Sequence, residues 1–509
     1  MVVHPSRPLL GLSPLLAFAL LLLTQVAARS AQAPSAAGRD APTLPPAHLG
    51  YGINVRDPDH LESLVAPLGF RWVKLYERYG AMPTTRLPYQ VLFRIDLHER
   101  ISSEGDFLDL DQWRQEVREI AMEGRGLVEA YEIGNEPNMA WQWGNRPPDP
   151  AQFVQALCTA YEAIKAVDPG AIVVSGGLGP VGRIEGTYVG YGGNTYTGHN
   201  GQVMDEREYA RWLFQLGAGD CFDVLGYHPF GFAYPPETAL DQLPPDDQGN
   251  GFAFRGVEAI RAIMEAHGLE GKPIWATEFG WARDPRSESI FWCEGTPDHD
   301  AFGWMLVSPE EQADYLVRAF QWADAHWPWM GALFVWNLDW HDQGHGPCDS
   351  IRWFSLLRQD GSPSPAYEAL AQMEKRPGPF GPRLAVQPSR LVLLAGLDRP
   401  QRFTRTLKVW NQGYRTFTWT ATVSPFVAGG TLAPPGIAPT LWVTRGRAGD
   451  RLTLTVDSYP ITRAGLYTSV IRLSAWPTDT LGTPQSVTLT LHATPRLYPV
   501  HLPLVLKGP

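Results

Sequence analysis

The chain alternates short apolar runs with longer stretches whose apolar residues recur at helical spacing. Strands that alternate with helices pair in parallel through right-handed crossovers. Eight such units within roughly 330 residues predict a (β/α)8 barrel (TIM barrel) rather than an open doubly wound sheet. No G-x-G-x-x-G motif follows the first run, which disfavours a dinucleotide-binding fold. The eight expected strands begin at Leu49, Phe70, Tyr89, Leu127, Ala171, Phe222, Pro273 and Gly331.

Two local patterns modify this plan. The connection between Tyr76 and Tyr89 is short and Pro-rich, so we expect its helix to be reduced or missing. Beyond Lys375, a hinge (RPGPFGP) leads into short β-branched runs with period-two alternation. That alternation predicts a small antiparallel β-sandwich, so the fold class is α/β followed by an all-β domain. The expected parts are a signal peptide (1–33), a linker (34–48), the barrel (49–376), a hinge (377–382), the β-sandwich (383–496) and a tail (497–509).

The N-terminal segment predicts export. Arg7 precedes the uncharged stretch Pro8–Ala28, and Ala31-Gln32-Ala33 offers a cleavage site for a signal peptidase. A retained membrane anchor is the alternative, but Pro14 and the short apolar centre argue against it. We therefore expect a secreted, periplasmic or cell-surface protein.

Export would place the four cysteines in an oxidising compartment. Cys293 and Cys348 fall in long Gly/Pro-containing loops after consecutive expected strands, so they are the best disulfide candidate. Cys158 lies in a helical pattern and Cys221 just before a strand, and we expect each to be a buried free thiol. With no C-x-x-C motif, a zinc site is not expected.

Composition narrows the partners. The formal net charge is -11 and no long run of Lys or Arg occurs, so nucleic acid is excluded as a partner. Apolar residues make up 44% of the chain and charged residues 19%, which is typical of globular proteins.

Two glutamates stand where barrel chemistry is located, at the carboxyl ends of expected strands. In EIGNEPN, Glu136 directly precedes a proline that ends the strand ladder. In WATEFGW, regular alternation puts Ile274, Ala276 and Glu278 on one face, with the small Ala276 leaving space beneath the carboxylate. Two carboxyl groups that flank a glycosidic bond are what its hydrolysis requires.

The Asn-Glu-Pro ending the fourth expected strand and the glutamate ending the seventh resemble glycoside hydrolase clan A, closest to families 5 and 39. The resemblance covers residues 49–376. It implies Glu136 as acid/base, Glu278 as nucleophile and a retaining double displacement, with carboxyl groups about 5–5.5 Å apart. It also implies that Asn135 binds the sugar 2-hydroxyl and that Trp336 floors the −1 subsite.

His228 in GYHPF matches a histidine that the clan often places at the end of the sixth strand. The clan often continues His-x-Tyr, but here Phe230 takes the third position. The tyrosine expected to support the nucleophile is therefore displaced, to Tyr227 or Tyr234, or absent.

Further polar residues lie on the expected strands. Arg94, Asp96 and His98 on the third strand and Lys74 on the second could contact sugar or orient the nucleophile, or form ion pairs inside the barrel. Glu132 has the parity of an inward-pointing residue and needs a cation such as Arg94, which makes it structural.

Tryptophans are frequent in the loops after the catalytic strands. Indole rings provide flat platforms for the C–H faces of sugars, so we expect an extended saccharide cleft. These tryptophans are Trp141, Trp143, Trp281, Trp292 and Trp340.

In the C-terminal part, WNQGYRTFTWTA resembles BACON-like and other Ig-like modules attached to bacterial carbohydrate-active enzymes. A spacer and a sugar-binding module both remain open, with a spacer favoured. Cell-surface association through this domain is a further expectation.

Together these patterns predict a monomeric retaining hydrolase of β-linked poly- or oligosaccharides that needs no cofactor or metal. One alternative is a non-catalytic carbohydrate-binding or scaffold protein with a barrel fold. Another is a metal-dependent hydrolase, disfavoured because no H-x-H lies on the first strand. Its candidate ligands would be His98, His228, His341 and His345.

Overall fold

The structure is a computed structural model, and several parts of the chain lie outside the residues it describes. These parts include the expected signal peptide, most of the linker and the tail from residue 498. Within the described residues, no helix is both long and apolar enough to cross a bilayer. Described are residues 47–101, 108–341, 345–378, 384–411, 417–428, 431–432, 439–447, 449–476, 480 and 483–497.

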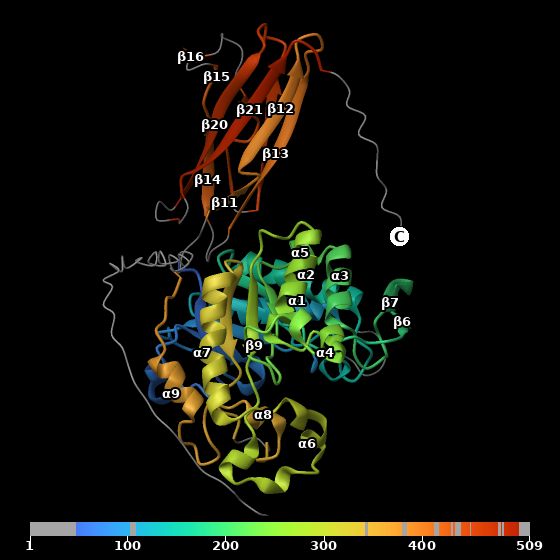
Figure 1. Cartoon of the computed structure of the whole chain (residues 1–509), viewed down its shortest axis with the longest axis vertical. Coiled ribbons are helices and arrows are strands. Elements are labelled where there is room, and N and C mark those ends of the chain that lie inside the picture. Colours follow the sequence, from blue (N-terminus) through green and yellow to red (C-terminus); the bar gives the residue numbers. More distant parts are fainter. Residues whose placement is uncertain are drawn as a thin grey trace, which may run out of the picture. The chain divides into compact units, whose positions relative to one another are not determined.

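Eight parallel strands form the predicted barrel, in the order β5-β4-β3-β2-β1-β10-β9-β8 (Figure 1). Every neighbouring pair is parallel. Isolated parallel bridges, Val174 to Val224 and Leu178 to Tyr227, join the two outer strands of this order. The barrel prediction is confirmed. The strands are β1 (Gly50–Asn54), β2 (Trp72–Tyr76), β3 (Gln90–Ile95), β4 (Ala130–Ile133), β5 (Ile172–Ser175), β8 (Leu225–Tyr227), β9 (Ile274–Phe279) and β10 (Met330–Val335).

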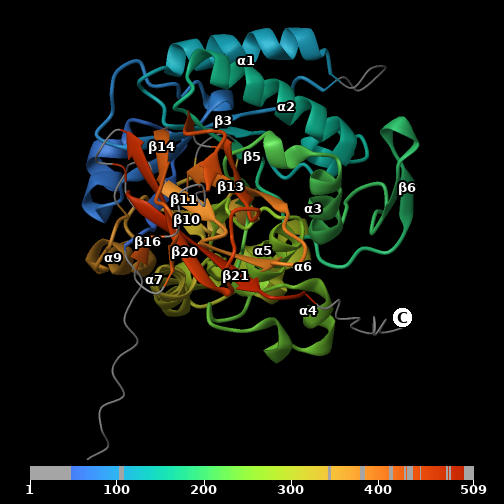
Figure 2. The ribbon, with the colours of Figure 1, turned by 90° about the horizontal axis from the view of Figure 1, so that it is seen from above.

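Helices surround these strands, and α1 and α2 run side by side along one flank (Figure 2). Local caps explain several starts: Asp109 accepts two backbone N–H bonds at α1, and Ser308 with Glu311 forms a capping box at α7. The helices are α1 (Leu110–Gly124), α2 (Pro150–Val167), α3 (Glu206–Gln215), α4 (Pro245–Asn250), α5 (Val257–Ala266), α6 (Pro297–Phe302), α7 (Pro309–His326), α8 (Ser350–Trp353) and α9 (Pro365–Gln372).

The first two connections contain no α-helix. The first is a π-helical turn (Leu61–Val65) followed by a 3-10 turn (Ala66–Leu68), where the amphipathic pattern predicted a helix. The second holds only the 3-10 turn Glu77–Tyr79, as its Pro-rich sequence predicts. After β5, a small hairpin of β6 (Thr187–Val189) and β7 (Thr195–Thr197) extends the loop.

Alternation along the strands divides the apolar residues into two layers. One set packs between the strands and the helices. The other set fills the barrel and includes Trp72, Trp275 and Phe334, with the Trp72 and Trp275 ring centroids 5.0 Å apart. Gly52 makes room for this filling, because a Cβ there would lie 2.5 Å from the Phe334 ring. The polar inward residues lie above, toward the carboxyl ends of the strands.

The C-terminal part forms two sheets around one core that includes Leu407, Trp419, Leu454 and Leu489. The first sheet is β11 (Leu384–Gln387), β13 (Arg402–Asn411), β19 (Arg451–Asp457) and β17 (Thr440–Leu441). The second is β12 (Arg390–Gly396), β21 (Gln485–Thr494), β20 (Gly465–Trp476), β14 (Thr418–Val423) and β18 (Arg445–Arg447), with β15 (Val427–Ala428) and β16 (Thr431–Leu432) beside it.

The sandwich is not wholly antiparallel, which corrects the sequence prediction. Strand β12 pairs with β21 in parallel, from Arg390 opposite Thr488 to Gly396 opposite Thr494. These strands are far apart in the chain, so no hairpin constrains their relative direction.

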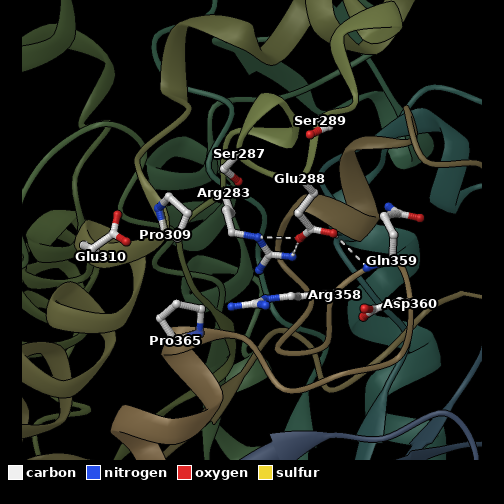
Figure 3. Close-up of a pocket in the computed structure, with 10 residues that line it drawn as sticks. All are labelled: Arg283, Ser287, Glu288, Ser289, Pro309, Glu310, Arg358, Gln359, Asp360 and Pro365. Carbon is white, nitrogen blue, oxygen red and sulfur yellow. Dashed lines mark hydrogen bonds and ion pairs between the residues drawn. The ribbon is translucent and has the colours of Figure 1, made fainter.

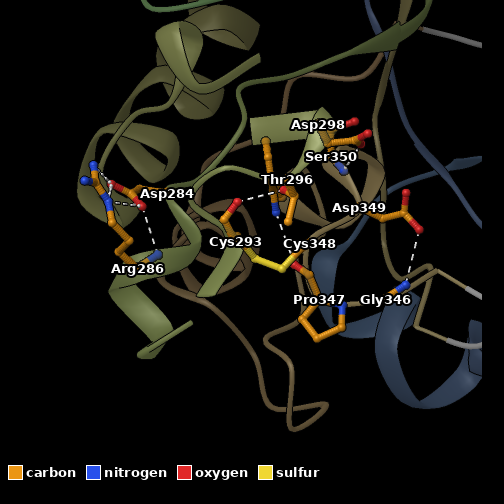
Figure 4. The surroundings of a disulfide bond; sticks show 11 residues. Asp284, Arg286, Cys293, Thr296, Asp298, Gly346, Pro347, Cys348, Asp349 and Ser350 are labelled. Carbon is orange, nitrogen blue, oxygen red and sulfur yellow. Dashed lines mark hydrogen bonds and ion pairs between the residues drawn. A yellow bond between two sulfur atoms is a disulfide. The ribbon is translucent and has the colours of Figure 1, made fainter. Parts of the chain in front are cut away.

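Two disulfides link the loops and helices of the barrel. The expected pair, Cys293 and Cys348, has a Cα–Cα distance of 5.1 Å and joins the loops after β9 and β10 (Figure 4). Cys158 and Cys221 are also bonded, with a Cα–Cα distance of 4.7 Å. The expectation of free thiols was wrong, because the fold brings a helix and a turn 63 residues apart into contact.

Replacing both Cys158 and Cys221 with Ala is expected to lower the free energy of unfolding by about 2–4 kcal/mol. The loss arises because the unfolded chain is no longer constrained by the cross-link. Urea denaturation followed by circular dichroism would measure it, with the protein in a thiol reductant as a comparison. Equal urea denaturation midpoints for the variant and the oxidised parent protein would contradict a stabilising disulfide between Cys158 and Cys221.

Candidate active site

Glu136, Glu278 and His228 converge at the carboxyl ends of the barrel strands. His228 Nδ1 lies 3.0 Å from Glu136 Oε1 and 3.9 Å from Glu278 Oε2. Together these two distances cap the separation of the two carboxylate oxygens at 6.9 Å. The His228 side chain is fully buried, whereas 17% of the Glu136 side chain and 6% of the Glu278 side chain remain exposed.

A bulge in β9 turns Glu278 into the barrel. Leu333 pairs with Ala276 and Val335 with Phe279, so β9 holds one residue more than β10 over this span. Ala276 and Phe279 both pack outside the barrel, against the helices. The sequence expectation that Ala276 lies beneath the carboxylate was therefore wrong. Regular alternation would have put Glu278 outside as well, and bulges are known to re-aim side chains in this way.

Glu136 is held by an unusual backbone conformation rather than by the strand. Strand β4 ends at Ile133, so alternation no longer determines where Glu136 points. Its φ is 34°, in the left-handed region that is rare for residues other than glycine and is often found at functional sites. Its N–H donates to the Gly177 carbonyl at 2.9 Å. A Cβ on Gly179 would lie 2.8 Å from Glu136 Oε1, so the glycine permits this close approach.

Buried cations surround Glu278. Lys74 Nζ donates to Glu278 Oε1 at 3.0 Å, and Arg94 Nη1 lies 3.6 Å from the same oxygen. Lys74 also pairs with Glu132 Oε2 at 2.7 Å, and both side chains are fully buried. The partner of Glu132 is thus Lys74 rather than the expected Arg94. The two carboxylates share this one ammonium group, which matters because an unpaired charge at such a site is costly.

Arg94 connects the nucleophile candidate to Asn135. Its Nη1 donates to Asn135 Oδ1 at 2.9 Å, which leaves the Asn135 amide hydrogens for another acceptor. Its Nη2 pairs with Asp96 Oδ1 at 2.9 Å, and its guanidinium lies 4.5 Å from the Tyr76 ring centroid. Burial opposes the charge, but Asp96, Tyr76 and Glu278 together raise the pKa of Arg94 above its ordinary value.

A tyrosine of β2, Tyr76, lies close to Glu278. Burial and the charge of Glu278 raise the pKa of Tyr76 well above its ordinary value, and its hydroxyl donates to Asn54 Oδ1. Tyr227 faces the helices, where burial and Glu206 raise its pKa. Tyr234 donates to Asp247. Neither expected tyrosine is directed at Glu278. The sequence did contain a signal for Tyr76, because it lies two residues after Lys74 on β2 and therefore points to the same, inward side of the strand.

Three of the expected tryptophan platforms are buried and serve packing. The indole N–H of Trp281 donates to the Tyr234 carbonyl at 2.8 Å. Trp143 donates to a backbone carbonyl, and Trp340 donates to a hydroxyl at 3.3 Å. All three are almost fully inaccessible to solvent, so their selection as sugar platforms was wrong.

The other tryptophans keep accessible surface. Trp141 and Trp292 are exposed. Trp336 follows β10 directly, is partly buried, and has its ring centroid 4.7 Å from that of Trp340. Trp336 therefore lies at the carboxyl end of β10, which is the strand next to β9.

The histidines do not form a common cluster. His98 pairs with Glu99 at 3.5 Å, His341 pairs with Asp339, and His345 lies 3.1 Å from Asp349. Across the described part of the chain, no group of three or more His, Cys, Asp or Glu side chains is arranged to hold a metal.

A cavity of about 450 Å³ lies beside the loops after β9 and β10 (Figure 3). Arg283 in its wall is held by Glu288 at 2.6 Å, and Arg358 points into the same space. Neither Glu136 nor Glu278 lines this cavity. The candidate active site at Glu136 and Glu278 is therefore separate from this cavity.

Glu206 supports the loop that approaches Glu136. It accepts from Val181 N and Gly182 N at 3.1 Å each, in the segment that follows Gly177 and Gly179. Burial, and secondly the charge of Asp205, raise its pKa from 4.5 to about 7.

Comparison with known proteins gives only distant similarities. No protein-family model and no curated protein sequence matches the chain. Among solved structures, a β-glucuronidase 2 from Bacteroides uniformis matches with a TM-score of 0.41 and 13% identity, over 88% of this chain and 46% of that one. An endo-β-1,3-glucanase from Amycolatopsis mediterranei matches with a TM-score of 0.38 and 14% identity, over 64% and 99%. An endo-β-1,4-mannanase from Thermotoga petrophila matches with a TM-score of 0.33 and 10% identity, over 89% and 98%. The chain spans less than half of the glucuronidase, and a functional assignment must rest on the site itself.

Lys74→Met is expected to destabilise the protein by about 3–5 kcal/mol, because it leaves two buried carboxylates without their shared cation. Lys165→Met is the matched control, since Lys165 forms a 2.6 Å pair with Asp223 at a partly exposed position. Denaturant midpoints would compare them. A loss of stability for Lys74→Met no larger than for Lys165→Met would contradict the stabilising role of the buried group Lys74, Glu132 and Glu278.

The raised pKa of Glu206 predicts a pH dependence of stability. The unfolded carboxyl loses its proton near pH 4.5 and the folded one near pH 7, so stability should fall as the pH rises across this interval. Glu206→Gln removes the titration and should flatten the profile between pH 5 and 8. Thermal unfolding in a buffer series would measure this, and an unchanged slope in the variant would refute it.

Proposed function

We propose that the protein is a retaining glycoside hydrolase that cleaves β-linked poly- or oligosaccharides by double displacement. The observation that carries this proposal is the single imidazole nitrogen of His228 reaching both carboxylates. The resulting 6.9 Å cap contains the separation of about 5–5.5 Å that retaining enzymes use.

The surroundings of the two glutamates support different roles. Lys74 and Arg94 both lie against Glu278 Oε1, and nearby positive charge stabilises a carboxylate anion. A nucleophile must be anionic, so Glu278 takes this role, with Oε2 left to attack. Glu136 is the more exposed of the two and can reach the oxygen of a leaving group.

The reaction then follows two steps. Glu278 attacks the anomeric carbon while Glu136 donates its proton to the glycosidic oxygen, which departs with the aglycone. A water molecule next gives its proton to Glu136 and attacks the same carbon, and Glu278 leaves as a carboxylate. The hydrogen bond from His228 Nδ1 positions Glu136 Oε1, and the same nitrogen lies 3.9 Å from Glu278 Oε2.

Other residues complete the proposed subsite. The Asn135 amide, oriented by Arg94, donates to a sugar hydroxyl, and Trp336 offers an apolar floor. Trp141 is accessible for a more distant sugar unit. The proposed chemistry requires neither metal nor cofactor. Two disulfides suit an exported protein, and we assign the β-sandwich a spacer role.

Glu278→Ala should lose nearly all hydrolysis of an aryl β-glycoside, and azide should restore turnover. Azide would occupy the space of the missing carboxylate and attack from that side, so the product should be the α-glycosyl azide. Glu136→Ala with azide should instead give the β-glycosyl azide, because the covalent intermediate still forms. Proton NMR of the products distinguishes the two anomers.

The unsubstituted protein should release the β-anomer first in the same NMR assay. Initial release of the α-anomer would overturn retention. Full activity in Glu278→Ala would overturn the assignment of the nucleophile and favour a non-catalytic role for the site.

A further inference from the structure

The loop between β9 and α7 is fastened at the catalytic end of the barrel. It contains α6 and follows the strand that carries Glu278, so it lies on the face where barrel active sites form. The disulfide from Cys293 to Cys348 ties it to the loop after β10, and Ser350 N donates to Asp298 Oδ2 at 2.7 Å (Figure 4). This double attachment gives the loop a defined position.

Trp304 is held in one orientation on this loop while 49% of it stays exposed. Its indole N–H donates to the Ala301 carbonyl at 3.0 Å. One ring, Phe232, stacks on it at 5.6 Å with an interplanar angle of 11°, and Phe252 lies 5.7 Å away. Because the indole is already immobilised, stacking of a ligand on it costs little conformational entropy of the Trp304 side chain.

A series of packed aromatic rings connects Trp304 with the carboxylates. Phe232 belongs to a buried cluster with Phe354, and both Phe230 and Trp336 pack against this cluster. Phe230 lies 5.2 Å from Phe354 and 6.1 Å from the ring of His228, which contacts both glutamates. These packed rings thus extend from His228 and the two glutamates to the exposed indole of Trp304.

We infer that Trp304 is a stacking platform for a sugar unit of the substrate that lies beyond the bond being cleaved. This inference rests on the proposed function and narrows its substrate class to extended β-linked saccharides. Pyranose rings present C–H faces that pack on aromatic rings, and the indole N–H of Trp304 is already occupied. The platform therefore recognises ring shape and chain length rather than particular hydroxyl groups.

The test compares Trp304→Ala with Phe302→Ala, an exposed aromatic on the same loop. Substrates are an aryl β-monoglycoside and β-linked gluco-, manno- and xylo-oligosaccharides of increasing length. On the longest oligosaccharide that is cleaved, Trp304→Ala should lower kcat/KM by about tenfold, the effect of one lost stacking contact. Phe302→Ala should leave it within about twofold. Trp304→Phe should retain most of the activity.

The monoglycoside distinguishes a platform from a structural role. Its kcat/KM should hardly change in Trp304→Ala, because it does not reach the platform. An equal loss on short and long substrates would overturn the inference, and so would no loss on either. A loss confined to the hydrophobic aryl glycoside would overturn it in favour of an aglycone site.

Binding separates this inference from the proposed function. Calorimetry with Glu278→Gln and the same oligosaccharides requires no turnover, and adding Trp304→Ala should weaken affinity by about tenfold. If no glycoside is hydrolysed by the unsubstituted protein but this loss of affinity is observed, the proposed function fails and the platform stands. Equal binding with and without Trp304, or no binding by either form, overturns the platform.

Discussion

The buried ammonium group of Lys74 is the interaction on which the active end of the barrel depends. It lies fully buried between Glu132 and Glu278, so each of these carboxylates has a cationic partner inside the barrel. Arg94 adds a second charge beside Glu278 and carries the connection to Asn135. Removing the ammonium would leave the buried Glu132 carboxylate without a cationic partner and Glu278 with only Arg94 beside it, which is costly.

Two local departures from regular backbone geometry bring the glutamates together. The bulge in β9 brings Glu278 inside, and the left-handed backbone at Glu136 directs the other carboxyl group to the same imidazole. Both departures depend on neighbours, since Gly177 and Gly179 let the loop after β5 approach closely. The arrangement of the two glutamates is therefore set by the contact between adjacent strand ends, while the strands themselves supply the rigid support.

The sequence predicted the eight strands and the barrel. It also predicted the disulfide between Cys293 and Cys348, because both cysteines lie in loops that are visibly long in the sequence. It also singled out both glutamates and His228, which the structure brings close together, because short motifs at strand ends are local features. It misjudged what surrounds them. The cation for Glu132, the tyrosine beside Glu278 and the burial of Trp281 each depend on which strands or loops become neighbours, and a single sequence carries no record of such pairing.

Alternation and helical spacing are properties of consecutive residues, so the sequence by itself determined the order of the elements and the class of the fold. It also determined that one carboxyl group stands just after β4 and another near the end of β9. The tertiary structure decided how far apart these groups lie and which charges face them. It also brought Cys158 to Cys221 and packed Trp304 against Phe232 and Phe252. The reason is physical: these contacts join segments distant in the chain, and only the closed barrel brings them within bonding range.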